Sequence, residues 1–235
     1  MSLLRAVIFD LDDTLFDTAG AMLTALDALT RTVPIFRGRT GTELFAMHTR
    51  YMHQIDPEVF SGQLNGPQAR VKRFTLMLAE CGAPDADGNG VSLAYRAIYR
   101  ASFRQMPGAG RLLEELRRRG LKVGVLTNYL REVQLETLES IGLLPLLDAL
   151  VTVSDAPPKP HPASYGAICK ALDVSPQQAV MVGDNWTNDV AGAVEAGLRA
   201  VWYAPAEALA PEERVLHGRL SSYEPQEAAL QVILG

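Results

Sequence analysis

The sequence has few of the features that are typical of secreted proteins, of proteins stabilised by a structural metal, or of membrane proteins. Only two cysteines occur in 235 residues, Cys81 and Cys169, and they stand far apart without metal-ligand spacing. Free thiols in a reducing cytoplasm are the simplest explanation. No apolar run approaches the length of a bilayer span, and the first apolar segment begins too early for a signal peptide to precede it. We therefore expect a soluble cytoplasmic protein with no membrane partner.

An excess of positive charge is also absent. The chain carries 22 Lys and Arg against 27 Asp and Glu, which gives a net charge of -5. The one basic cluster, Arg117 to Arg119, falls near the end of an expected helix, where cations suit the helix dipole. Because nucleic-acid binding requires a basic face, we expect no nucleic-acid partner. We expect a monomer or homodimer that acts on a small molecule.

The most informative feature is a short apolar segment that ends in two carboxylates. Residues 7–9 have the branched and aromatic composition of a buried strand, and Asp10, Leu11 and Asp12 follow at once. In open α/β sheets the ligand crevice lies at the carboxyl ends of the strands. Two acids at this position repel each other unless a cation joins them, and Mg²⁺ prefers carboxylates together with phosphate oxygens. The alternative is a solvated acidic turn that caps the next helix.

Three further polar groups follow strand-like segments in the same way. Residues 121–126 lead into Thr127 and Asn128, and residues 179–182 lead into the acids Asp184 and Asp189. Between them, Lys159 comes a few residues after the apolar stretch 149–153, although a solvated surface lysine is the ordinary alternative. The loops that follow parallel strands meet at one edge of the sheet, so we expect these groups to converge.

This ordered set resembles the four motifs of the haloacid dehalogenase superfamily of hydrolases. The resemblance implies that Asp10 is the nucleophile, that Asp12 is the general acid and base, and that Thr127 and Lys159 hold the phosphoryl oxygens. It also implies a Mg²⁺ site. The expected metal ligands are Asp10, Asp12 and Asp184 with support from Asp189, and backbone N–H groups near Leu11 and Asn128 are expected to hold phosphate.

The fold class implied is α/β: a Rossmann-like, doubly wound parallel sheet with an inserted all-helical cap domain. Strand and helix patterns alternate after residue 105, as parallel sheets with right-handed crossovers require. Residues 18–104 show helical periodicity instead. We therefore expect residues 1–17 and 105–235 to form the catalytic core and residues 18–104 to form the cap, which the resemblance implies closes over the active site.

Helices are expected at 41–54, 68–81 and 92–104 in the cap, and at 190–196 and 225–234 in the core. Candidate substrate contacts in the cap are polar residues on these helices: His48, Arg50, Tyr51, His53, Arg70, Lys72 and Arg73. Trp186, inside the last acid motif, is expected either to wall the substrate pocket or to pack against the cap or core.

Asp12 also distinguishes between reactions. A halide needs no proton as it leaves, so the dehalogenases of this superfamily have no acid at that position. The leaving oxygen of an ester does need a proton. We expect a Mg²⁺-dependent phosphatase that hydrolyses a small phosphorylated metabolite, a sugar phosphate or nucleotide monophosphate, through an aspartyl-phosphate. A phosphomutase of the same superfamily, or a non-hydrolytic protein that binds or accepts phosphate for regulation, is the alternative.

Overall fold

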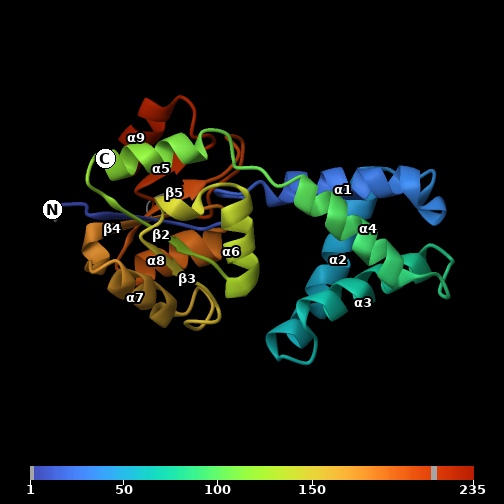
Figure 1. Ribbon diagram of the computed structural model, residues 1–235. Coiled ribbons are helices and arrows are strands. Elements are labelled where there is room, and N and C mark those ends of the chain that lie inside the picture. Colours follow the sequence, from blue (N-terminus) through green and yellow to red (C-terminus); the bar gives the residue numbers. More distant parts are fainter. Residues whose placement is uncertain (1–2, 213–215) are drawn as a thin grey trace. The chain divides into compact units, whose positions relative to one another are not determined.

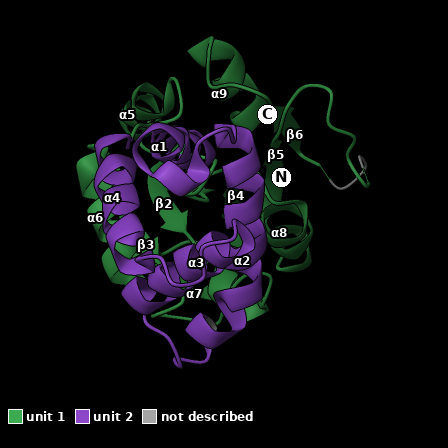
Figure 2. Cartoon of the chain, turned by 90° about the vertical axis from the view of Figure 1, so that its right-hand side faces the viewer, with its two compact units in different colours: residues 1–17, 104–235 green, residues 18–103 purple. Residues whose placement is uncertain are grey.

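The computed structural model describes residues 3–212 and 216–235. The chain divides into two compact units, coloured separately in Figure 2. Unit 1 contains residues 1–17 and 104–235, and unit 2 contains residues 18–103. None of the helices in the described ranges is both long enough and apolar enough to cross a lipid bilayer.

Unit 1 is built on a parallel sheet whose strands appear as arrows in Figure 1. Within the described residues its strands are β1 (Ala6–Phe9), β2 (Lys122–Leu126), β3 (Ala149–Val151), β4 (Ala179–Gly183), β5 (Arg199–Tyr203) and β6 (Gly218–Leu220). Their order across the sheet is β3-β2-β1-β4-β5-β6, and every pairing is parallel. The order reverses direction beside β1, which is the topological switch point of a doubly wound sheet. The expected α/β fold class is confirmed.

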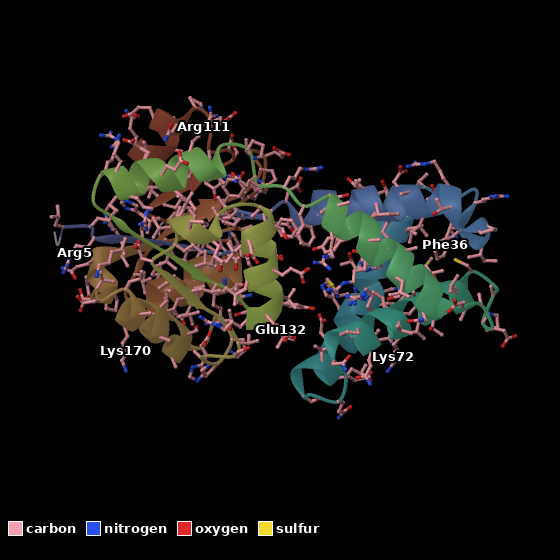
Figure 3. All side chains as sticks on the ribbon, viewed as in Figure 1. Arg5, Phe36, Lys72, Arg111, Glu132 and Lys170 are labelled. Carbon is pink, nitrogen blue, oxygen red and sulfur yellow. The ribbon has the colours of Figure 1, made fainter. Side chains whose placement is uncertain are left out.

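The central strands are buried because both faces of the sheet are covered by helices. All four residues of β1 and all five of β4 are buried, as the continuous apolar runs predict. The covering helices of unit 1 are α5 (Ala109–Arg118), α6 (Arg131–Ser140), α7 (Pro162–Ala171), α8 (Gly192–Glu195) and α9 (Gln226–Leu234). In Figure 1, α5 and α9 lie on one side of the sheet, and α7 and α8 lie on the other. Side chains fill the space between these layers (Figure 3).

Unit 2 is entirely helical in its regular structure. Its helices are α1 (Thr18–Thr32), α2 (Gly41–Phe60), α3 (Gly66–Glu80) and α4 (Gly88–Ala101). They pack around a separate apolar cluster that includes Leu29, Phe36 and Phe74. Thr40 and Glu43 form a reciprocal capping box that starts α2, with Thr40 N donating to Glu43 Oε2 at 2.7 Å.

Two helices of unit 2, α2 and α4, have boundaries that differ from the sequence expectation by more than two residues. α4 begins at Gly88 rather than residue 92, because the side chain of Asp87 accepts a hydrogen bond from Gly90 N at 2.9 Å and makes the glycine-rich segment the first helical turn. α2 continues to Phe60 and passes through Pro57, well beyond the expected end at residue 54.

The helix expected at 190–196 also starts earlier. A π-helical turn runs from Trp186 to Ala191 and leads directly into α8. The Asn185 side chain caps this turn by accepting a hydrogen bond from Asn188 N at 2.9 Å. The acid motif that follows β4 is therefore the beginning of a helix and not a loop.

Candidate active site

The sequence-predicted site residues meet at the carboxyl edge of the sheet in unit 1. Asp10 follows β1, Thr127 follows β2 and Asp184 follows β4, and β1 lies between the other two strands. A hollow of about 220 Å³ lies between these strand ends. It is lined by Asp10, Asp12, Asp13, Thr127, Asn128, Tyr129, Lys159, Asp184, Asn185, Asn188 and Asp189.

Lys159 is the centre of a buried ionic cluster. Its Nζ donates to Asp10 Oδ1 at 2.6 Å and to Asp189 Oδ1 at 2.7 Å, and its side chain is only 2% exposed. Burial lowers the pKa of Lys159, but the charges of Asp10 and Asp189 outweigh burial and raise the pKa overall. Lys159 is therefore an ammonium ion fixed between two carboxylates, and the alternative of a solvated lysine is excluded.

Negative charge exceeds positive charge in this cluster. One carboxylate oxygen from each of Asp10, Asp184 and Asp189 lies within 4.8 Å of the other two. Burial raises the pKa of Asp184 to about 7, and the charges of Asp10, Asp189 and Asp13 add to this shift. Burial also raises the pKa of Asp189, although Lys159 opposes the change. Because one lysine faces three acids, a divalent cation with oxygen ligands fits the chemistry of this donor set.

The side chain of Asp12 lies in the hollow but outside this group of three acids. Its Oδ2 accepts a hydrogen bond from Gln134 Nε2 at 2.8 Å. The same nitrogen donates to Thr127 Oγ1 at 2.9 Å. Gln134, on α6, is buried, and sequence reasoning missed it because a single glutamine inside an amphipathic helix carries no motif.

Two backbone N–H groups are available at the positions where the motifs predict phosphate binding. Among the described residues, the N–H groups of Leu11 and Asn128 have no acceptor within the protein, although Leu11 is fully buried. A buried donor of this kind calls for a partner, and an anion is a suitable one. The side chain of Asn128 meanwhile binds the backbone of Lys159 in both directions, at 2.7 and 2.8 Å.

The acid motif after β4 is held by residues from distant parts of unit 1. Thr14 Oγ1 accepts from Asp184 N at 3.1 Å, and Trp202 Nε1 donates to Asp184 O at 2.8 Å. Asn185 N donates to Asp189 Oδ2 at 3.0 Å. These contacts fix the positions of two acids that a short loop alone would leave variable.

Trp186 packs against the core of unit 1. Its ring meets that of Trp202 edge-on, with centroids 5.2 Å apart, and it joins the apolar cluster beneath β4 and β5. Of the alternatives for Trp186, packing against the core is the one that the structure shows.

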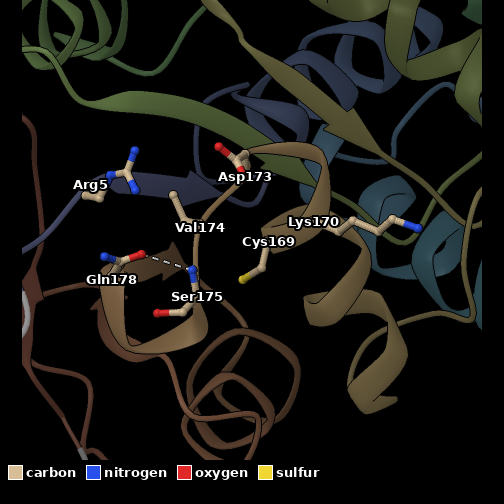
Figure 4. Close-up of a pocket in the computed structure, with 7 residues that line it drawn as sticks. All are labelled: Arg5, Cys169, Lys170, Asp173, Val174, Ser175 and Gln178. Atoms are coloured by element: carbon tan, nitrogen blue, oxygen red, sulfur yellow. Dashed lines mark hydrogen bonds between the residues drawn. The ribbon is translucent and has the colours of Figure 1, made fainter.

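A larger hollow, of about 420 Å³, lies at the opposite edge of the sheet (Figure 4). Arg5 precedes β1, and Ser175 and Gln178 precede β4, so this hollow lies at the amino ends of those strands. Cys169 is buried there, and burial raises its thiol pKa to about 11, which leaves it protonated and unreactive. The acids and the lysine of the ionic cluster line the smaller hollow instead.

The candidate substrate contacts of the helical segment all lie in unit 2. Several of them pair within it: Lys72 Nζ binds Glu58 Oε1 at 2.6 Å, and Arg73 Nη1 lies 2.9 Å from His48 Nε2. Arg50 pairs with Glu80. His48 is fully buried in unit 2, so it is a core residue of that unit.

Comparison with known proteins agrees with this architecture. A family model described as haloacid dehalogenase-like hydrolase matches residues 4–197. Glyceraldehyde 3-phosphate phosphatase of Pyrococcus abyssi is 28% identical over 207 residues, covering 86% of this chain and 82% of that protein. Phosphoglycolate phosphatase of Rhodospirillum rubrum is 32% identical over 212 residues, covering 84% of this chain and 78% of that protein.

Among solved structures, the HAD-hydrolase YfnB of Bacillus subtilis, described as bound to magnesium, superposes with a TM-score of 0.74 at 21% identity. The match covers 97% of this chain and 99% of YfnB. The sheet order, the site at the switch point and the family match over most of the sequence lead to one conclusion: this chain belongs to the haloacid dehalogenase-like hydrolases.

Proposed function

We propose that this protein is a Mg²⁺-dependent phosphatase that hydrolyses a small phosphate monoester through an aspartyl-phosphate on Asp10. The observation that carries the proposal is the buried cluster in which Lys159 contacts both Asp10 and Asp189 beside Asp184. A carboxylate nucleophile at a strand end, with positive charge beside it, is what a covalent phosphoryl transfer requires.

In the first step, a carboxylate oxygen of Asp10 attacks phosphorus and the ester P–O bond breaks. Asp12, which lines the same hollow, donates its proton to the leaving alkoxide. In the second step, Asp12 accepts a proton from water as the water attacks phosphorus, which releases inorganic phosphate and restores Asp10. The N–H groups of Leu11 and Asn128, with Thr127 and Lys159, hold the phosphoryl oxygens throughout.

The acids Asp10 and Asp184, with Asp189 in support, would hold the metal. When bound, Mg²⁺ supplies positive charge to the phosphoryl oxygens, where negative charge accumulates during transfer. Asp12 was also expected among the metal ligands. Because its Oδ2 accepts from Gln134 and its carboxylate lies outside the group of three acids, we assign the Asp12 side chain to proton transfer instead.

Two observations favour phosphate esters over halides as substrates. Asp12 is present and lies in the hollow, and only an ester oxygen needs the proton it would donate. Relatives that match most of the chain are named as phosphatases of glyceraldehyde 3-phosphate and phosphoglycolate. We therefore place phosphorylated metabolites as small as glyceraldehyde 3-phosphate and phosphoglycolate first among the candidate substrates. Sugar phosphates and nucleotide monophosphates come next. Unit 2, inserted between β1 and β2, is the proposed cap domain, with a role in substrate selection.

The proposal is tested by measuring phosphate release from glyceraldehyde 3-phosphate, phosphoglycolate, phosphoserine, sugar phosphates, nucleotide monophosphates and p-nitrophenyl phosphate, with Mg²⁺ and with EDTA. We expect release that depends on Mg²⁺ and is abolished in Asp10→Asn. Asp173→Asn is the matched control, since Asp173 is an exposed acid at the opposite edge of the sheet and its left-handed backbone accommodates Asn. Substantial turnover by Asp10→Asn removes Asp10 as the nucleophile, and isomerisation without phosphate release indicates the mutase.

A further inference from the structure

Gln134 links two groups that the proposed reaction uses in different ways. It is 2% exposed and lies in the first turns of α6, far in sequence from Asp12. Its side-chain amide carries two N–H donors, and the structure directs Nε2 to both Asp12 Oδ2, at 2.8 Å, and Thr127 Oγ1, at 2.9 Å.

The chemistry of the partners fixes the orientation of the amide. A carboxylate only accepts hydrogen bonds, so the nitrogen of Gln134, and not its oxygen, must face Asp12. Both N–H groups are then directed at acceptors, one at Asp12 and one at the Thr127 hydroxyl oxygen. Because Thr127 accepts from Gln134, its own hydroxyl proton points elsewhere, and the hollow that Thr127 lines is where a phosphoryl oxygen would receive it.

We infer that Gln134 is a positioning residue that aligns the general acid Asp12 with the phosphate-binding hydroxyl of Thr127. This inference rests on the proposed phosphatase function. Holding one oxygen of Asp12 restricts rotation of the carboxyl group, so its proton is delivered along a fixed direction. Precise orientation of this kind strongly affects rate, since small displacements of a reacting group reduce catalysis by large factors.

The inference predicts a loss that depends on the leaving group. Gln134→Met keeps the length of the side chain and removes both donors, and Gln134→Glu keeps its shape while replacing the nitrogen by an oxygen that repels Asp12. For each variant, kcat and KM are measured with p-nitrophenyl phosphate, whose leaving group needs little protonation, and with an alkyl phosphate, whose leaving group needs a full proton. We expect kcat for the alkyl phosphate to fall by about 10²-fold and that for p-nitrophenyl phosphate by no more than about 10-fold.

Thr137→Val is the matched control. Thr137 is a buried polar residue of the same helix, and its hydroxyl bonds only to Val133 O among the described residues. We expect this variant to leave the ratio of the two kcat values within about two-fold of the wild-type ratio. Equal losses for both substrates in Gln134→Met and Gln134→Glu would show that Gln134 only supports packing, and would overturn the inference.

A double variant keeps the test decisive if either single change also weakens folding. Asp12→Asn already removes the general acid, so adding Gln134→Met should lower alkyl phosphate turnover by less than about 10-fold more. Losses that multiply fully would mean that Gln134 acts independently of Asp12, which contradicts the inference. If wild-type protein releases phosphate from neither substrate, the proposed function itself fails, and this outcome is distinct from the failure of the role assigned to Gln134.

Discussion

At the scale of single residues, the site depends on a buried lysine balanced by acids. Lys159 Nζ contacts Asp10 and Asp189, and the side chains of Lys159 and Asp189 are at most 2% exposed. Taking these charges out of water is unfavourable unless each one keeps its partner. The cluster is therefore more informative about function than about stability, because an apolar core would fold equally well without it.

Removing the lysine alone should leave two buried carboxylates without their counter-ion. We expect Lys159→Met to lower the free energy of unfolding by about 3–5 kcal/mol in metal-free protein, measured by urea denaturation. The double variant Lys159→Met with Asp189→Asn should recover a substantial part of that loss, because one of the stranded charges is gone. If the two changes are simply additive, Lys159 and Asp189 are not energetically coupled, and the described ion pair makes no net contribution.

At the scale of elements, the end of β4 has to be glycine because the acid motif folds back on it. A Cβ added at Gly183 would lie 2.4 Å from Asp189 Cγ, which is far closer than atoms can approach. The strand therefore ends in a residue whose lack of a side chain leaves room for the buried Asp189 carboxylate.

Gly183→Ala should displace Asp189 and with it the ionic cluster. We expect a loss of about 1–3 kcal/mol in stability from overpacking, and at least a 10-fold fall in phosphate release as the acid moves. Gly166→Ala is the matched control: its added Cβ meets nothing within 4 Å on α7, and alanine there should be neutral or stabilising. Unchanged activity in Gly183→Ala would show that the position of Asp189 is not critical.

A second element-scale feature is the buried histidine of α2. His48 Nε2 lies 2.9 Å from Arg73 Nη1 of α3, and the ring packs against Phe74 and Tyr95. Burial, with the nearby charge of Arg73, holds the pKa of His48 well below its usual value of 6.5. The imidazole is therefore neutral in the folded protein, since Arg73 can only donate and Nε2 must accept.

This pKa shift makes folding sensitive to acid. Between the lowered folded pKa and about 6.5, the unfolded chain binds a proton that the folded chain does not, so stability falls as pH decreases through that window. We expect the stability of the folded protein to fall progressively as the pH drops below about 6.5. His48→Gln, which keeps an acceptor for Arg73, should flatten the dependence of urea stability on pH between 7.5 and 5.5. Identical slopes in the two proteins would contradict this assignment.

At the scale of the whole molecule, one unit contains all the residues of the candidate active site, and the other is a separate helical unit. The acids, the lysine, Thr127 and Gln134 all belong to unit 1, which is made of two stretches of chain interrupted by unit 2. The two stretches of unit 1 end side by side at the insertion, since Phe16 pairs with Gln105 and Asp17 N donates to Arg104 O at 3.1 Å. This arrangement allows an insertion without disturbing the sheet.

Metal binding to unit 1 should raise its thermal stability. At a Mg²⁺ concentration about 100-fold above Kd, binding to the folded state alone adds about 2.7 kcal/mol, which corresponds to a rise in Tm of roughly 5–10 °C. Tryptophan fluorescence reports this unit, because Trp186 and Trp202 both lie in it. Asp184→Asn should abolish most of the shift, whereas Asp173→Asn should keep it. An equal shift in Asp184→Asn would place the metal elsewhere.

The sequence predicted much of this molecule because several signals are local. Continuous apolar runs at β1, β2 and β4 indicate strands buried on both faces, and each run ends in the polar group that the site uses. Family motifs then name Asp10, Asp12, Thr127, Lys159 and Asp184 as the residues to examine. The expected parallel α/β core and the family are confirmed, while the catalytic roles stay predictions.

Boundaries were less predictable where side-chain caps decide them. The start of α4 depends on one hydrogen bond from Gly90 N to Asp87, and the helical turn at Trp186 depends on one from Asn188 N to Asn185. Both segments resemble turns in composition, and nothing in their apolar periodicity shows that capping has made them helical.

The sequence by itself determined the buried strands β1, β2 and β4 and the order of the motifs that follow them, because both follow from the apolar pattern and from the polar residues at the end of each run. Only the tertiary structure decided the pairing: that Lys159 joins Asp10 to Asp189, and that Gln134 joins Asp12 to Thr127. The physical reason is that these contacts connect residues up to 149 positions apart. Burial and hydrogen-bond geometry at the switch point of the sheet select such partners, and no local pattern in the chain encodes them.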